Sequence, residues 1–169
     1  MKRITVFALA TALLVLTAGL SFRADAQWQK GDGDPGRETR DLPAFDKIDA
    51  GGVAEIRLSQ GTEQRTEVEA DKNLLPYIKT SVEDETLVIS TEKIRDFSKL
   101  IIHVTLPGLT YIHASGASHV IGVTPFEIPY LMIEGSGACE VEMELSVQNL
   151  ESELSGAAEV NLEGTAGSH

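Results

Sequence analysis

Serine hydroxyls that could act as nucleophiles recur in three similar segments of the chain. The segments read SGASHV at residues 115–120, SGACEV at 136–141 and SGAAEV at 155–160. A catalytic serine is needed once, and the nucleophile turn of many hydrolases has the pattern Gly-x-Ser-x-Gly between a strand and a helix, which these segments do not match. Cys139 shares its place in the motif with Ser118 and Ala158, so this place favours a small side chain. We therefore interpret the segments as structural turns and predict no catalytic residue in them.

Four glutamates follow the second and third motif serines at matching distances. They are Glu140 and Glu144 in one segment and Glu159 and Glu163 in the next. If the segments stack as neighbouring strands, each pair lies about 4.8 Å apart. Carboxylates this close either raise a pKa or recruit a cation, and oxygen ligands in an exported protein favour Ca²⁺, which is the one cofactor that the sequence predicts. The alternative is a solvated acidic face whose side chains splay apart.

Three histidines and two tyrosines share the outward parity of these glutamates. His103, His113 and His119 could be zinc ligands, but zinc sites usually show tighter spacing and companion ligands, so no zinc site is predicted. Tyr111 and Tyr130 could stack on a sugar ring and are the candidate ligand-binding residues. The alternative is that both rings only cover a shoulder of the fold.

The spacing of the motifs indicates which elements position these residues. The motif serines are 21 and 19 residues apart, and a degenerate copy at Gly51-Gly52 begins 64 residues before Ser115, a gap that three turns of about 21 residues would cover. Apolar residues recur at odd offsets from each serine, which is the period expected of strands with one buried face. The glycines predicted to form the corners between strands are Gly52, Gly116, Gly137 and Gly156.

These periods predict an all-β solenoid with about 19–21 residues per coil, because neither the leucine-rich nor the helical repeat pattern is present. Residues 65–91 indicate a less regular set of strands with a turn at 83–85, and residues 100–106 indicate a strong strand. Residues 53–61 and 64–70 are expected to pair antiparallel across a short turn.

The first 26 residues have the pattern of a secretory signal peptide. A cationic start, Met1-Lys2-Arg3, precedes an apolar run and the site Ala24-Asp25-Ala26. We therefore expect a periplasmic, cell-surface or secreted protein with no membrane insertion after cleavage. Residues 27–40 are predicted to be a flexible leader, and residues 41–169 to be the β-helix domain with an incomplete last coil.

The negative charge of the chain limits the kinds of molecule that it can bind. The formal net charge is −12, and after Lys99 the chain has nine glutamates and no lysine, arginine or aspartate. Such a surface repels phosphate backbones and anionic lipid headgroups, so nucleic acid is not a predicted partner. A single cysteine also excludes an internal disulfide.

Several stretches resemble the putative auto-transporter adhesin family with the head GIN domain. They are the three motif segments, FDKIDAGGVAEIRLSQG, NLLPYIKTSVEDETLVIST and Leu106-Pro107, and the resemblance covers about residues 40–165. It implies a single-stranded right-handed parallel β-helix in an exported bacterial protein, and it supplies no catalytic residues to transfer.

We predict an exported, non-catalytic binding or adhesion module that presents an acidic solenoid surface to a cell-surface or extracellular glycan or protein. The first alternative is a carbohydrate-active enzyme, either a polysaccharide hydrolase or a lyase, on the same scaffold. It is disfavoured because uronate lyases need cationic groups or a metal, and the motif region has no lysine or arginine. The second alternative is a structural or assembly protein of the cell envelope. An uncovered last coil also predicts end-to-end self-association.

Overall fold

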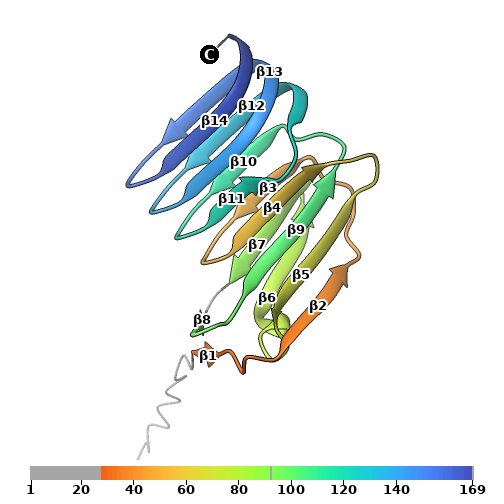
Figure 1. Cartoon of the computed structure of the whole chain (residues 1–169), viewed down its shortest axis with the longest axis vertical. Helices are drawn as coiled ribbons and strands as arrows, with labels where there is room; N and C mark the ends of the chain where they lie inside the picture. The colour runs from red at the N-terminus through yellow and green to blue at the C-terminus, as the bar shows by residue number, and fades with distance from the viewer. Residues whose placement is uncertain (1–27, 92, 169) are drawn as a thin grey trace, which may run out of the picture.

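The computed structural model describes residues 28–91 and 93–168, and their regular structure is almost entirely β (Figure 1). The predicted signal peptide, residues 1–26, lies outside the described residues. Within the described part of the chain, no helix has the length and apolar character needed to cross a membrane.

The elements follow one another along the chain with short connections. They are β1 (Gln29–Lys30), β2 (Pro35–Arg40), β3 (Lys47–Ala50), β4 (Glu55–Gln60), β5 (Arg65–Asp71), the 3₁₀ helix η1 (Leu75–Tyr77), β6 (Ile78–Glu83), β7 (Thr86–Thr91), β8 (Ile94–Arg95), β9 (Leu100–Leu106), β10 (Tyr111–Ala114), β11 (His119–Gly122), β12 (Phe126–Gly135), β13 (Glu140–Leu154) and β14 (Glu159–Ser168). The strands predicted within residues 65–91 and 100–106 are confirmed as β5, β6, β7 and β9.

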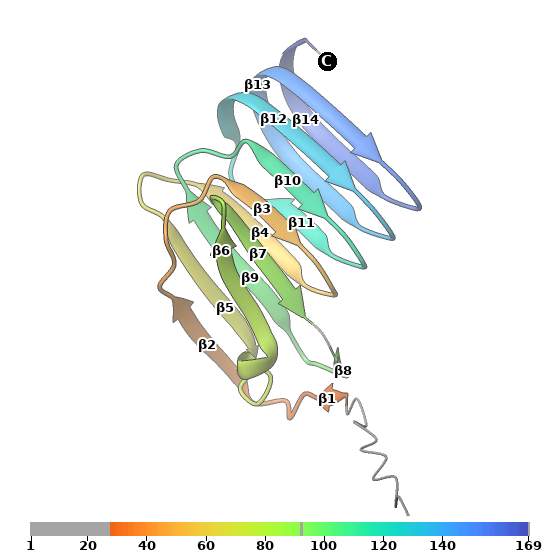
Figure 2. The ribbon, with the colours of Figure 1, turned by 180° about the vertical axis from the view of Figure 1, so that it is seen from behind.

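One mixed sheet of twelve strands makes up the body of the molecule, and β1 pairs with β8 separately. The strand order is β2-β5-β9-β4-β11-β13-β12-β10-β3-β7-β6, with β14 added beside β13. The long strand β13 joins the two halves of this path, because its first residues pair with β11 and its later residues pair with β12. The sheet thus curls back on itself into a nearly closed, barrel-like shell whose two layers face the viewer in Figures 1 and 2 respectively.

The core lies between the two layers and follows from the period-2 pattern. Ile48, Ile112 and Ile133 are neighbours on β3, β10 and β12, and each is fully buried. Fully burying one such side chain contributes about 1.5–3 kcal/mol. Since alternate residues point inward, the residues between the buried ones are displayed on the outer surface of each layer.

The predicted fold class, a single-stranded right-handed parallel β-helix with about 19–21 residues per coil, is wrong. Three strand pairs, β2–β5, β5–β9 and β6–β7, are antiparallel within one mixed sheet. The 64-residue interval before Ser115 does not hold three coils, because β10 pairs directly with β3 and β11 pairs directly with β4. The strands in that interval extend the sheet at its edges instead. A two-residue period of apolar residues is expected of strands in a parallel solenoid and in a mixed sheet alike, so this period could not distinguish the two folds.

Local turn chemistry accounts for one of these reversals. Asp84 and Glu85, between β6 and β7, have φ angles of 49° and 62°. Two consecutive positive φ angles are typical of a type I′ hairpin, whose twist matches that of the flanking strands. Glu83 pairs with Thr86 across the turn, so the turn predicted at residues 83–85 is confirmed.

The N-terminal region also differs from the expectation. The last six residues of the expected flexible leader form the strand β2, which pairs antiparallel with β5. The guanidinium of Arg37 on β2 reaches the carboxylates of Glu67 and Glu69 at 2.9 and 2.8 Å. The expected antiparallel pairing of β4 with β5 is wrong, because β9 lies between them and bonds to both.

Candidate functional site

A stack of tight turns sets the register of the strands on both layers. In each turn the backbone N–H after the motif glycine donates to the carbonyl of the glycine in the preceding turn: Ala117 to Gly52 at 2.8 Å, Ala138 to Gly116 at 2.8 Å and Ala157 to Gly137 at 2.7 Å. The four glycines predicted at corners all lie in this stack, with φ of +98° for Gly52, +74° for Gly116, +86° for Gly137 and +77° for Gly156. Cys139 is buried behind the stack, so its thiol is not presented to solvent.

Two matching columns of side chains lie on the strands that flank this stack of turns, one on each layer. On one layer the column is Asp49, His113, Glu134 and Glu153, and on the other it is Glu55, His119, Glu140 and Glu159. Each column therefore has the order acid, histidine, glutamate, glutamate. Direct neighbours on adjacent strands are about 4.8 Å apart, so these groups interact with one another.

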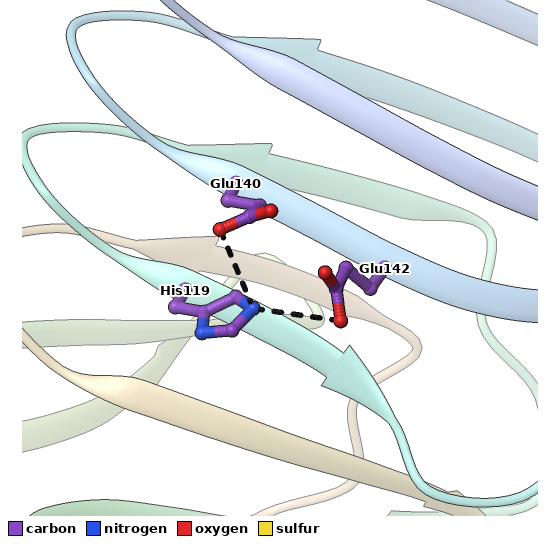
Figure 3. Close-up of side chains that lie close together, drawn as sticks. All are labelled: His119, Glu140 and Glu142. Carbon is purple, nitrogen blue, oxygen red and sulfur yellow. Dashed lines mark ion pairs between the residues drawn. The ribbon is translucent and has the colours of Figure 1, made fainter.

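His119 lies between two carboxylates in its column (Figure 3). Its Nε2 atom is 3.8 Å from an Oε2 atom of both Glu140 and Glu142. One ligand atom from each of the three residues falls within a group in which all separations are below 4.8 Å. The Nε2 atom is enclosed and has no hydrogen-bond partner among the described residues. An imidazole nitrogen and two carboxylate oxygens can share a proton or bind a divalent metal ion.

The other two acids of this column are held by residues of their own strands. Arg57 donates from Nε to Glu55 on β4, and Asn161 donates from Nδ2 to Glu159 on β14 at 3.3 Å. His119 is thus left with the carboxylates on β13 as its charged neighbours.

The other two histidines lie apart from this cluster, each beside a carboxylate. Nδ1 of His113 is 2.9 Å from Oδ1 of Asp49, and Nε2 of His103 is 3.2 Å from Oε2 of Glu69. Glu69 is nearly buried, and its pKa is lowered chiefly by the hydrogen bond from Lys99, with burial opposing the shift. The structure therefore does not bring the three histidines together.

The two tyrosines predicted to bind a ligand lie on neighbouring strands, β10 and β12, with their side chains partly buried. The hydroxyl of Tyr111 donates to Glu134 at 2.7 Å, and burial together with this bond raises the pKa of Tyr111 far above its usual range. The pKa of Tyr130 is also raised, by burial and by the charge of Glu151. Each phenol thus has a carboxylate partner, and stacking on a sugar ring stays a prediction.

The four glutamates predicted to bind a cation are neighbours as expected from the motif alignment. Glu140 pairs with Glu159 and Glu144 pairs with Glu163, on β13 and β14. Together with Glu142 they form what we call the acidic face. An open groove of about 560 Å³ runs along it, lined by residues that include Glu142, Glu144 and Glu163. Calcium binding by this face stays a prediction.

Sequence reasoning missed the convergence of Glu142 with His119. The available signal was parity, because Glu142 is two residues beyond Glu140 and therefore faces the same side of β13. His119 and Glu140 are 21 residues apart in the chain, yet they are direct partners between β11 and β13.

Comparison with known proteins identifies the family. Residues 44–169 match the family described as "Putative auto-transporter adhesin, head GIN domain". The chain belongs to this family. The resemblance drawn from its motifs is therefore confirmed. Among curated proteins, no relative matches the chain.

Solved structures of similar fold include two proteins described as putative adhesins. One, from Bacteroides fragilis, is 29% identical with a TM-score of 0.75, and the match covers 82% of this chain and 66% of that one. The other, from Parabacteroides merdae, is 24% identical with a TM-score of 0.73, covering 80% of this chain and 59% of that one. A protein from Parabacteroides distasonis described as a putative lipid binding protein is 18% identical with a TM-score of 0.66, covering 83% and 70%. The chain thus spans about three fifths to two thirds of the length of the two adhesins.

Proposed function

We propose that the protein is an exported, non-catalytic binding or adhesion module that contacts its partner through the acidic face. The observation that carries this proposal is the register of Glu140, Glu144, Glu159 and Glu163 on two adjacent strands. No lysine or arginine occurs in the chain after Lys99 to neutralise them. A surface with one sign of charge steers an oppositely charged partner toward it.

The partner chemistry follows from this charge. A cell-surface or extracellular glycan or protein that displays amino groups or basic side chains would complement the carboxylates. The groove along the face would hold an extended chain segment of such a partner. Membership of a family described as an adhesin supports the same role, as does the 29% identical structure described as a putative adhesin.

The hydrogen bonds of two of the three motif serines support the non-catalytic part of the proposal. The Ser115 hydroxyl donates to the carbonyl of Ala50 at 3.4 Å, and the Ser155 hydroxyl donates to that of Gly135 at 3.3 Å. These hydroxyls serve the stacked turns, and neither is bonded to a histidine that could activate it.

Binding to arrays of glycans and extracellular proteins, at low and at raised salt, tests the proposal. A variant with Glu144→Gln, Glu159→Gln and Glu163→Gln removes three charges from the acidic face. Its matched control, Glu38→Gln, Glu83→Gln and Glu85→Gln, removes three charges from distant strands and a turn. We expect wild type and control to bind cationic partners, the face variant to lose at least about tenfold in affinity, and salt to weaken binding.

Three results would contradict this function. The first is equal loss in both variants, which would reduce the effect to net charge. The second is an absence of binding to every partner by protein whose circular dichroism shows it to be folded. The third is release of cleaved glycan from the array, which would make the protein an enzyme.

A further inference from the structure

The cluster of His119, Glu140 and Glu142 combines two independent features. The first is that three potential metal ligands of two chemical types converge from neighbouring strands, with His119 on β11 and both glutamates on β13. The second is that the Nε2 atom at its centre is enclosed and lacks a hydrogen-bond partner among the described residues. A distance of 3.8 Å to each carboxylate is too long for a hydrogen bond and leaves room for an atom between them.

We propose that His119, Glu140 and Glu142 bind a divalent transition-metal ion, of which Zn²⁺ is the test case. Mixed nitrogen and oxygen ligands suit this class of ion, whereas Ca²⁺ takes oxygen ligands alone and usually six to eight of them. The site shares Glu140 with one of the calcium pairs expected at Glu140–Glu159 and Glu144–Glu163, but it differs from both pairs in its histidine ligand and in the ion. It does not depend on the adhesive role proposed above.

The geometry needs only small side-chain adjustments to close around an ion. Zinc lies about 2.0–2.2 Å from nitrogen and oxygen ligands, so tetrahedral ligand atoms are about 3.4 Å apart. The imidazole nitrogen is already 3.8 Å from both oxygens, and all separations are below 4.8 Å. The glutamate side chains are 41% and 45% exposed, so their rotamers can change without disturbing the core.

The two outer acids of the column have hydrogen-bond partners of their own, whereas the glutamates beside His119 face its imidazole. Glu55 and Glu159, on either side, are engaged by Arg57 and Asn161. Two carboxylates on one strand repel each other, and an ion between them and the imidazole removes that repulsion. Three protein ligands leave the fourth position of a tetrahedral ion for a water or for a group from a partner.

The test is a titration of the purified protein with Zn²⁺ by calorimetry at neutral pH, together with the visible spectrum of the Co²⁺-loaded protein. We expect one ion per chain and the intense visible absorption of tetrahedral Co²⁺. The variants His119→Gln and Glu142→Gln should each weaken binding by at least about 10–100-fold, the loss seen when even an outer-shell partner of a metal is removed.

Two matched controls separate a built site from general attraction. Glu144→Gln removes the same charge from the same strand, two residues beyond Glu142, and His113→Gln removes the corresponding histidine of the other layer. Both should bind Zn²⁺ as wild type does, and an equal concentration of Ca²⁺ should not displace the ion. The proposal is overturned by an absence of saturable binding, by equal weakening in Glu144→Gln, or by displacement with Ca²⁺. Melting curves without metal verify that every variant is folded.

Discussion

Replacing Gly137 by alanine tests the stacked turns that hold both columns in register. Gly137 has φ of +86°, a region that residues with a Cβ rarely adopt. A Cβ built on it lies 2.8 Å from the carbonyl oxygen of Gly116. That oxygen accepts the backbone hydrogen bond from Ala138 at 2.8 Å. The turn cannot relieve the clash without lengthening the bond that joins it to the turn below.

The expected loss of unfolding free energy follows from three contributions. A side chain held at positive φ costs about 1–3 kcal/mol. A weakened backbone hydrogen bond adds about 0.5–1.5 kcal/mol. Alanine also stiffens the unfolded chain, which returns about 0.4–1 kcal/mol. We expect Gly137→Ala to lose about 1–4 kcal/mol of unfolding free energy, which lowers Tm by about 3–12 °C for a protein of this size.

Thermal and urea unfolding of three alanine variants separates the terms. Gly108 has no neighbour within 4 Å of a built Cβ, and Gly33 has none either but has φ of +79°. Gly108→Ala should therefore be within about 0.5 kcal/mol of wild type. Gly33→Ala should show the conformational cost alone, and Gly137→Ala should show the largest loss. If Gly137→Ala melts within a degree or so of Gly108→Ala, the stacked-turn reasoning is refuted.

Three further outcomes are expected. The pKa of buried Asp71 is lowered chiefly by the hydrogen bond from the Ser98 hydroxyl. Its carboxylate therefore stabilises the fold fully at pH values above the unfolded pKa of about 4. This stabilisation is lost as the pH falls through the lower pKa of the folded state. Asp71→Asn should therefore be less stable than wild type at neutral pH in urea unfolding, with a difference that shrinks in acid; a constant difference would contradict this role. Cys139 is buried, so a thiol reagent should label it only in denaturant, and labelling of the native protein would contradict its placement. Among the described strands, β14 bonds to β13 alone. Its outer edge should therefore pair with a second copy of the chain once salt screens the charges of the glutamates. Light scattering should show dimers that Val160→Lys reduces, and a strict monomer at high salt and high concentration would contradict this pairing.

The local pattern of the chain was sufficient to predict most of its strands from residue 45 onward, and which face of them is buried, but it missed β2 in the expected leader. Alternation of apolar and polar residues depends only on the two-residue period of extended backbone, which is a local property. The strand at residues 100–106 is predictable from local sequence in this way, and the turn at residues 83–85 from the charged residues that separate two strand patterns. The motif alignment also placed Glu140 beside Glu159, because a tight turn of constant length carries the register from one segment to the next.

Tertiary structure alone decided which strands pair and in which direction. The period of two is the same in a parallel stack and in an antiparallel edge. The length of the interval before Ser115 therefore fits three coils, although the interval holds the mixed strands β5 to β9. The convergence of His119 with Glu142 depends on the pairing of β11 with β13. Glu142 is the direct partner of Ile121, and it reaches His119 diagonally from one of these adjacent strands to the other. Such contacts depend on the free energy of the whole sheet. In that sum, the pairing of strands distant in the chain outweighs the local conformational preferences of neighbouring residues.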